Sequence, residues 1–148
     1  MAFTEELRAQ REIGARPERV WEVLTGFEAF GSWNPFIVSI EGEPVVGSRL
    51  KVRLQPPGGR GISLRPTVTT SERGKAFGWL GRLGVPGVFD GAHRFELEAM
   101  PDGGTRFVQS EHFSGALVPL LRRSLRTHTL AGFEAMNRAL EERVEAAA

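Results

Sequence analysis

The carboxy-terminal residues 116–145 have the pattern of one long helix, and this feature most limits what the rest of the chain can form. At 100° per residue the apolar positions share one broad stripe, and the charged residues lie opposite it. Pro119 falls in the first turn, where its missing N–H costs no hydrogen bond. The predicted stripe consists of Leu117, Leu121, Leu125, Gly132, Met136, Ala139 and Leu140. A stripe this long predicts a curved sheet wrapped around the helix.

Small and polar residues interrupt this stripe near its middle. Gly132 costs roughly 1 kcal/mol of helix stability relative to alanine. His128 and Thr129 place polar atoms beside the same stripe. A buried face of this kind favours a helix that lines a ligand cavity over one that faces a dry, filled core.

The remainder of the chain reads as short strands around two short helices. A helix is predicted to begin at Pro17, and a second helical turn to end at Trp33, before the break at Asn34 and Pro35. From there the hydrophobic period drops to two. The predicted strands cover residues 3–13, 36–41, 50–54, 62–70, 77–80, 88–99 and 105–113. This order predicts an α+β fold with an antiparallel sheet of seven strands and its helices on one face.

Length and composition narrow the class of protein further. A chain of 148 residues fits one domain, expected to span residues 1–148. The net charge of +1 argues against a nucleic-acid partner, and the absence of cysteine excludes disulfides and thiolate metal sites. No apolar leader or membrane-length run is present, so we expect a cytoplasmic protein without stable membrane insertion. The preference for arginine over lysine suggests a bacterial genome rich in GC. Monomer and homodimer both remain open.

The last two predicted strands carry the residues most suited to chemistry. A five-residue turn sequence joins them, and its length sets their register. In that register His93 lies opposite Glu111 and Phe95 opposite Gln109, all on the inner face. Opposed residues have Cβ atoms about 4.5–5.5 Å apart, close enough for a hydrogen bond between the two side chains. The pair can serve proton transfer, or it can be a buried interaction that fixes the register.

The other two histidines carry less information. His128 can contact a polar ligand head from the helix, or bond to a strand carbonyl at the helix edge. His112 has outward parity and receives no role. The spacing and parity of the three histidines do not match a metal site, so we expect no metal and no cofactor.

Several segments together resemble a known superfamily. They are residues 17–21 (PERVW), 33–36 (WNPF), 77–79 (FGW), 93–97 (HRFEL), 104–107 (GTRF) and 132–140 (GFEAMNRAL). In this pattern the chain is similar to the SRPBCC superfamily, and within it to the START-like polyketide cyclase/dehydrase-like proteins. The resemblance covers nearly the whole chain. It implies a helix-grip fold: seven antiparallel strands curved around a long carboxy-terminal helix, two short helices between the first two strands, and a deep apolar cavity.

Three functions are compatible with this pattern. The first is binding of a small hydrophobic or aromatic ligand, lipid-like or polyketide-like, between sheet and helix. The second is a cyclase or dehydratase with His93 and Glu111 as acid and base, and the third is a structural or chaperone-cofactor role without a ligand. The residues expected to line the ligand site are Trp33, Phe36, Trp79, His93, Phe95, Gln109, Glu111, Phe113, Leu125, His128, Thr129, Gly132 and Met136.

Overall fold

A computed structural model describes residues 3–146, so residues 1–2 and 147–148 of the expected domain lie outside the described part. The strands are β1 Thr4–Ile13, β2 Ile37–Glu41, β3 Lys51–Leu54, β4 Ile62–Leu64, β5 Thr67–Glu72, β6 Ala76–Arg82, β7 Asp90–Ala99 and β8 Thr105–Ser114. The helices are α1 Pro17–Thr25, the 3₁₀ turn η1 Phe27–Ala29, α2 Phe30–Trp33, α3 Val118–Ser124, the π-helical η2 Leu125–Thr129 and α4 Leu130–Ala146. This is the predicted α+β order.

The strands form two antiparallel sheets, ordered β1-β8-β7-β6-β5 and β2-β3-β4. The prediction of one strand over residues 62–70 was wrong, and the described chain has eight strands in place of seven. Pro66 has no N–H to donate, and it restricts Arg65 before it, so the ladder breaks between them. The segment before the break pairs with β3, and the segment after it pairs with β6.

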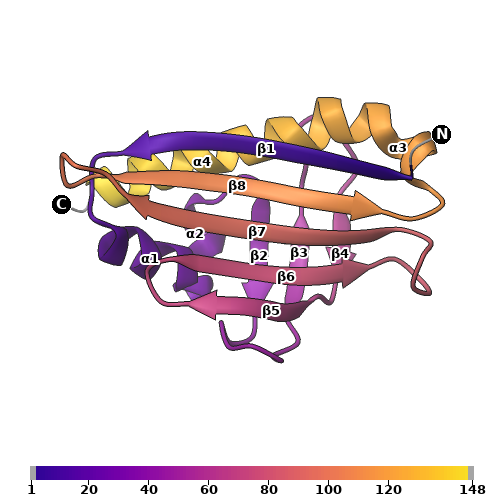
Figure 1. Ribbon diagram of the computed structural model, residues 1–148, viewed down its shortest axis with the longest axis horizontal. Coiled ribbons are helices and arrows are strands. Elements are labelled where there is room, and N and C mark those ends of the chain that lie inside the picture. The colour runs from indigo at the N-terminus through magenta and orange to yellow at the C-terminus, as the bar shows by residue number, and fades with distance from the viewer. Residues whose placement is uncertain (1–2, 147–148) are drawn as a thin grey trace.

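The two sheets meet at the start of β3 and curve into one wall. The amide of Leu50 donates to the carbonyl of Pro66 at 2.8 Å, and Arg49 bridges to Thr67. Register shifts in β2 and β5 add bends to the strands. Figure 1 shows the β2-β3-β4 sheet crossing behind the five-stranded sheet, with α1 and α2 at one end and the carboxy-terminal helix running along β1. This is the helix-grip arrangement.

The carboxy-terminal helical run is interrupted by a wide turn. It runs from Val118 to Ala146, but residues 125–129 are π-helical. Leu117 was expected on the buried stripe; it is the N-cap residue of α3 and is 37% exposed, so that prediction was wrong. Beyond the π turn the buried face follows the prediction at Met136 and Leu140. π-bulges of this kind occur frequently at functional sites.

Aromatic side chains fill much of the interior between the sheets and α4. Phe77 stacks on Phe95 at 6.3 Å between ring centroids, and Phe95 stacks on Phe107 at 5.9 Å. Trp21 of α1 and Phe27 of η1 close the same cluster against Phe77. The interior near α1 is therefore a packed aromatic core.

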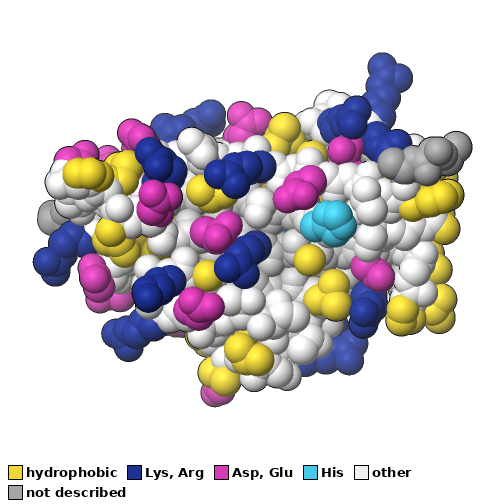
Figure 2. Space-filling model, in the orientation of Figure 1, with side chains coloured by type: hydrophobic (Ala, Val, Ile, Leu, Met, Phe, Trp, Pro, Cys, Tyr) yellow, Lys and Arg dark blue, Asp and Glu magenta, His cyan; other side chains and the backbone are white. Residues whose placement is uncertain are grey.

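The outer face of the five-stranded sheet is polar and of mixed charge. Figure 2 shows basic and acidic side chains interleaved across it, with hydrophobic side chains gathered at the end that holds the β6–β7 loop and the start of α3. Exposed residues there include Leu83, Val85, Leu117 and Leu120. Within residues 3–146, no helix has both the length and the apolar character needed to cross a bilayer.

Candidate functional site

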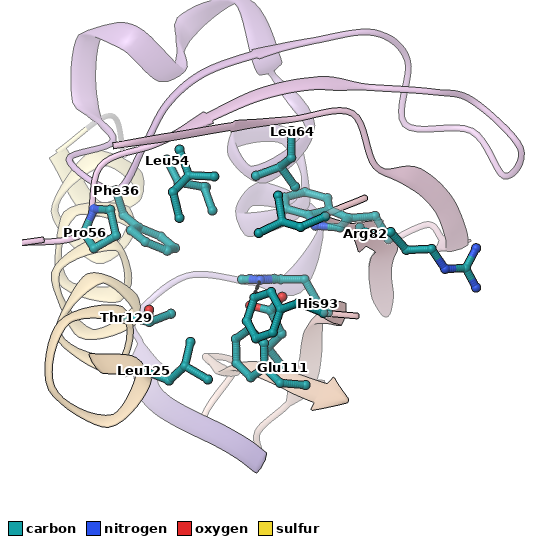
Figure 3. A pocket seen from close by; sticks show the side chains of 16 residues that line it. Phe36, Leu54, Pro56, Leu64, Arg82, His93, Glu111, Leu125 and Thr129 are labelled. Atoms are coloured by element: carbon teal, nitrogen blue, oxygen red, sulfur yellow. Dashed lines mark hydrogen bonds and ion pairs between the residues drawn. The ribbon is translucent and has the colours of Figure 1, made fainter. Parts of the chain in front are cut away.

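An apolar cavity of about 80 Å³ lies between the β2-β3-β4 sheet, the inner face of β6, β7 and β8, and the π-helical turn η2. Figure 3 shows Leu125 and Thr129 pointing into it from the helix, across from His93 and Glu111. The lining residues are Phe36, Leu54, Pro56, Ile62, Leu64, Trp79, Gly81, Arg82, Leu83, Phe89, Gly91, His93, Glu111, Phe113, Leu125 and Thr129. Sheet and helix thus enclose a mostly apolar space with a few polar groups, as ligand pockets usually do.

The β7–β8 hairpin places the polar pair of this cavity. His93 is the register partner of Glu111, and the predicted pairing is confirmed. The turn between β7 and β8 fixes this register. In it the carboxylate of Asp102 accepts a hydrogen bond from the amide of Gly104 at 2.9 Å. Gly103 between them has φ +90°, a conformation that favours glycine. A tight turn of defined length therefore sets the alignment of the pair farther along the two strands.

Four side chains form one continuous hydrogen-bonded chain from β7 to α4. Nδ1 of His93 lies 3.0 Å from Oε1 of Glu111, and its Nε2 lies 2.9 Å from Oε1 of Gln109. Nε2 of Gln109 donates to Oδ1 of Asn137 at 2.8 Å and to the carbonyl of Phe133 at 3.4 Å. Because His93, Gln109 and Asn137 are at most 2% exposed, these bonds are shielded from water. The network links the cavity wall at His93 and Glu111 to the carboxy-terminal helix α4.

The backbone carbonyl of Phe133 sets the direction of this chain. A carbonyl can only accept, so the amide nitrogen of Gln109 faces it and the amide oxygen faces His93. Nε2 of His93 must then donate to that oxygen. One further proton lies between Nδ1 of His93 and Oε1 of Glu111, either as an imidazolium and a carboxylate or as a neutral pair.

Aromatic rings hold His93 from three sides. The Trp79 ring stacks on the imidazole with centroids 5.0 Å apart and planes at 26°. Phe95 lies at 4.7 Å and Phe133 packs edge-on at 5.0 Å. Such rings attract a cationic imidazole through their negative faces. With both ring nitrogens bonded and its ring enclosed in this way, His93 is fixed in one orientation.

The mouth of the cavity opens beside the β6–β7 loop. Leu83 and Ile62 line it and are 40% and 37% exposed. Arg82 also belongs to the lining, but Figure 3 shows its guanidinium directed away from the cavity, and it pairs with Asp90 at 3.6 Å. The entrance is thus apolar, and Leu83 is also one of the exposed hydrophobic residues of the β6–β7 loop.

An ion pair anchors the π-helical turn to β1 beside the cavity. Nε of Arg126 lies 2.7 Å from Oε2 of Glu5, and Arg122 lies 3.4 Å from the same oxygen. The hydrogen bond from Arg126, with the positive charges of both arginines, lowers the pKa of Glu5 below its ordinary value of 4.5. The turn that carries Leu125 and Thr129 is therefore held against the edge of the sheet.

Of the predicted ligand-site residues, seven line the cavity and six do not. Those that line it are Phe36, Trp79, His93, Glu111, Phe113, Leu125 and Thr129. Trp33, Phe95, Gln109, His128, Gly132 and Met136 lie outside its lining. Among these, Gln109 bonds to the polar pair from behind, whereas Phe95 and Met136 belong to the packed core.

Two of the residues outside the lining have identifiable partners. Nδ1 of His128 lies 3.1 Å from the carbonyl of Pro57, in the loop between β3 and β4, whereas the alternative to a ligand role had a strand carbonyl as the partner. A Cβ on Gly132 would overlap the ring of Phe36, so this glycine admits a neighbouring side chain. Phe36 fills the space beside Gly132, so this glycine does not line the cavity as expected.

Several residues of the site were not predicted from the sequence. Some of them line the cavity, and another, Asn137, ends the hydrogen-bonded chain. Leu54, Leu64 and Phe89 line the cavity although their positions give no signal beyond ordinary alternation. Asn137 could have been found, because a buried helix position four residues after Phe133 carries an amide. Among the described residues 3–146, no three histidine, aspartate or glutamate side chains are grouped so that they could hold a metal ion.

Solved structures of low sequence identity share this fold along nearly its whole length. Protein TTHA0849 from Thermus thermophilus is 22% identical, with 97% of this chain and 99% of that chain covered and a TM-score of 0.77. The Zhui aromatase/cyclase from Streptomyces sp. R1128 is 15% identical, with coverage of 96% and 94% and a TM-score of 0.73. Norcoclaurine synthase from Thalictrum flavum is 13% identical, with coverage of 99% and 98% and a TM-score of 0.76. At these identities the likeness shows the fold alone.

Sequence comparison identifies the family more directly. No curated protein matches the chain significantly. Residues 4–147 match the family described as polyketide cyclase / dehydrase and lipid transport. This match spans nearly all of the chain, as the resemblance in its motifs implied. The protein therefore belongs to the polyketide cyclase/dehydrase and lipid transport family.

Proposed function

We propose that the protein binds a small hydrophobic or aromatic molecule in the cavity between the sheets and the π-helical turn. The observation that carries this proposal is the lining itself, in which apolar side chains surround one buried polar pair. The π-helical turn η2 forms one wall of this cavity, and π-bulges occur frequently at functional sites. The structural relatives include an aromatase/cyclase and norcoclaurine synthase, which agrees with a small organic ligand.

The size of the cavity limits what it can hold. Its volume of about 80 Å³ is smaller than the roughly 150 Å³ of an engineered apolar cavity that binds benzene. One aromatic ring therefore fits only with part of the molecule projecting through the mouth. The remainder of a longer ligand would lie against exposed Leu83 and Ile62.

A second candidate function is enzymatic, and Glu111 favours it. This carboxylate lines the cavity, is partly exposed and is held by an imidazole, as a general base would be. In this role Glu111 withdraws a proton from the substrate, and His93 is a positioning residue because both of its nitrogens are engaged. Incubation with polyketide and aromatic ketone substrates tests it. Turnover that disappears in Glu111→Gln while binding persists would favour the enzyme.

Binding is tested with the neutral fluorescent probe N-phenyl-1-naphthylamine, whose phenyl ring matches the cavity. Its fluorescence should rise on titration with the wild-type protein. Thr129→Trp places an indole in the cavity and should weaken probe binding by about tenfold or more, equivalent to about 1.4 kcal/mol. Thr127 lies on the same helical turn and is exposed, so Thr127→Trp serves as the matched control and should leave the affinity unchanged.

The two variants separate binding in the cavity from binding elsewhere. Equal affinity in wild type, Thr129→Trp and Thr127→Trp would contradict this proposal, because the probe would then lie at another surface. Circular dichroism of both variants checks that the fold is retained. If the folded wild-type protein does not bind the probe at all, a structural role without a ligand would explain the protein better than ligand binding.

A further inference from the structure

The second carboxylate oxygen of Glu111 is left open to the cavity. Oε1 is occupied by His93 at 3.0 Å, whereas Oε2 makes no hydrogen bond with the described residues. The Glu111 side chain is 12% exposed, although the residue lines the apolar cavity. Oε2 lies over Gly91, where any Cβ would overlap it. The glycine in β7 thus makes room for this oxygen at the cavity wall.

The hydrogen-bond chain behind Glu111 fixes what this oxygen can do. Nε2 of His93 donates to Gln109, so one proton lies between Nδ1 of His93 and Oε1 of Glu111. If the proton is on the imidazole, Glu111 is a carboxylate and Oε2 accepts. If it is on Oε1, Oε2 is the carbonyl oxygen of the acid and again accepts. The cavity therefore presents an acceptor in both proton positions.

The other polar side chains of the lining do not replace this acceptor. The Trp79 indole can only donate, Arg82 points outward, and the Thr129 hydroxyl can donate or accept. Among the described side chains of the lining, Glu111 is thus the group that can only accept. An apolar or carbonyl-bearing molecule placed against it would cover Oε2 without a partner, which costs binding energy.

From this geometry we infer that the ligand is an aromatic molecule with a hydroxyl group that donates a hydrogen bond to Oε2 of Glu111. A neutral donor suits the site better than a cation, because His93 and Glu111 together carry no net charge and the walls are apolar. The aromatic body is matched by Phe36, Phe89 and Phe113 around the cavity. This inference rests on the proposed binding function and adds the chemical class of the ligand.

The test compares three ligands of one ring at pH 7 by isothermal titration calorimetry. They are 4-propylphenol, which donates, 4-propylanisole, whose oxygen only accepts, and propylbenzene, which does neither. Propylbenzene is the most apolar and the smallest, so a purely hydrophobic cavity binds it most tightly. A hydrogen bond to Oε2 of Glu111 reverses this order, and we expect 4-propylphenol to bind about tenfold more tightly than either of the others.

Variants of Glu111 assign the preference to its carboxyl group. Glu111→Leu should abolish the preference for 4-propylphenol and leave propylbenzene binding intact or tighter. In Glu111→Gln the amide N–H can donate to His93, so the amide oxygen still accepts in the cavity and a smaller preference remains. Glu96→Gln removes a carboxylate from the outer face of the same strand as His93 and should change nothing. If Glu111→Leu does not fold, the affinities of the three ligands for the wild type and for Glu111→Gln still show whether the preference for 4-propylphenol depends on Glu111.

The outcomes separate this inference from the function on which it rests. If the affinities of the three ligands follow their hydrophobicity, with propylbenzene tightest, the inferred preference for a hydroxyl group is wrong and the proposed binding function still holds. Equal affinities for 4-propylphenol and 4-propylanisole would also overturn it, because Trp79 or Thr129 would then recognise the oxygen. A preference that survives in folded Glu111→Leu would overturn the assignment to Glu111. If none of the three binds, the binding function itself fails.

Discussion

Replacing Gln109 by methionine tests whether the buried hydrogen bonds from His93 through Gln109 to Asn137 stabilise the packing of helix α4 against the sheet. Gln109 is fully buried on β8, and its amide joins His93 at 2.9 Å to Asn137 at 2.8 Å. Methionine has a similar length and fills the same space, so no large cavity is created. The expected loss therefore comes from the polar partners that remain.

The magnitude follows from those partners. His93 and Asn137 each lose a buried hydrogen bond, at about 1–3 kcal/mol for each unsatisfied group. The apolar methionine side chain recovers on the order of 1 kcal/mol through burial. We expect Gln109→Met to lower the free energy of unfolding by about 1–5 kcal/mol, compared with the roughly 5–15 kcal/mol of a typical domain.

Urea denaturation followed by circular dichroism measures this loss. The midpoint should fall while the slope with urea stays unchanged. Ser110→Ala, at the half-buried neighbouring position, is the control and should stay within about 0.5 kcal/mol of the wild type. In the double variant Gln109→Met/Asn137→Leu, the effects should be less than additive by about 0.5 kcal/mol or more. A Gln109→Met protein as stable as the wild type, with additive effects, would refute the network as a stabilising link.

The contacts around the cavity lead to three further predictions. Gly132→Ala should lower the melting temperature. Overlap of the new methyl group with Phe36 costs about 1–3 kcal/mol, which exceeds the gain in helix propensity of about 1 kcal/mol. An unchanged melting temperature would contradict this prediction. Glu5 stabilises the fold above its ordinary pKa of 4.5, and this contribution should disappear as the pH falls below 4.5 through the lowered pKa of the folded state. Urea unfolding at several pH values should therefore show a weaker acid dependence in Glu5→Gln, and an identical dependence would refute the role of the Arg126 pair. His128→Ala should leave probe affinity within about twofold, since its ring bonds to a loop carbonyl; a larger loss would return this residue to the ligand site.

The fold and the polar pair could be predicted from the sequence because both depend on local patterns. The five-residue turn and the inward parity of Phe95 set the register of β7 and β8, so the contact between His93 and Glu111 could be counted. The long amphipathic helix required a curved sheet of the observed kind. The family motifs lie in these same elements, so the resemblance and the pattern agree.

Features that depend on three-dimensional packing could not be predicted in this way. The stacking of Phe77 on Phe95 and of Phe95 on Phe107 fills part of the interior, and no spacing along the chain encodes how much space such packing leaves for a cavity. The partner of Gly132 is Phe36, almost a hundred positions earlier along the chain. The π-helical turn shifts the phase of the helix by an extra residue per turn, and nothing in residues 125–129 marks that change.

A small aromatic ligand is proposed to lie between the π-helical turn and the polar pair of His93 and Glu111. Intermolecular nuclear Overhauser effects measured on the complex with 4-propylphenol would locate its ring in the protein. We expect contacts from the ring protons to the methyl groups of Leu54, Leu64, Leu125 and Thr129, which line the cavity. Contacts confined to methyl groups outside this lining, such as those of Val45 and Val46 on the exposed loop before β3, would contradict the account.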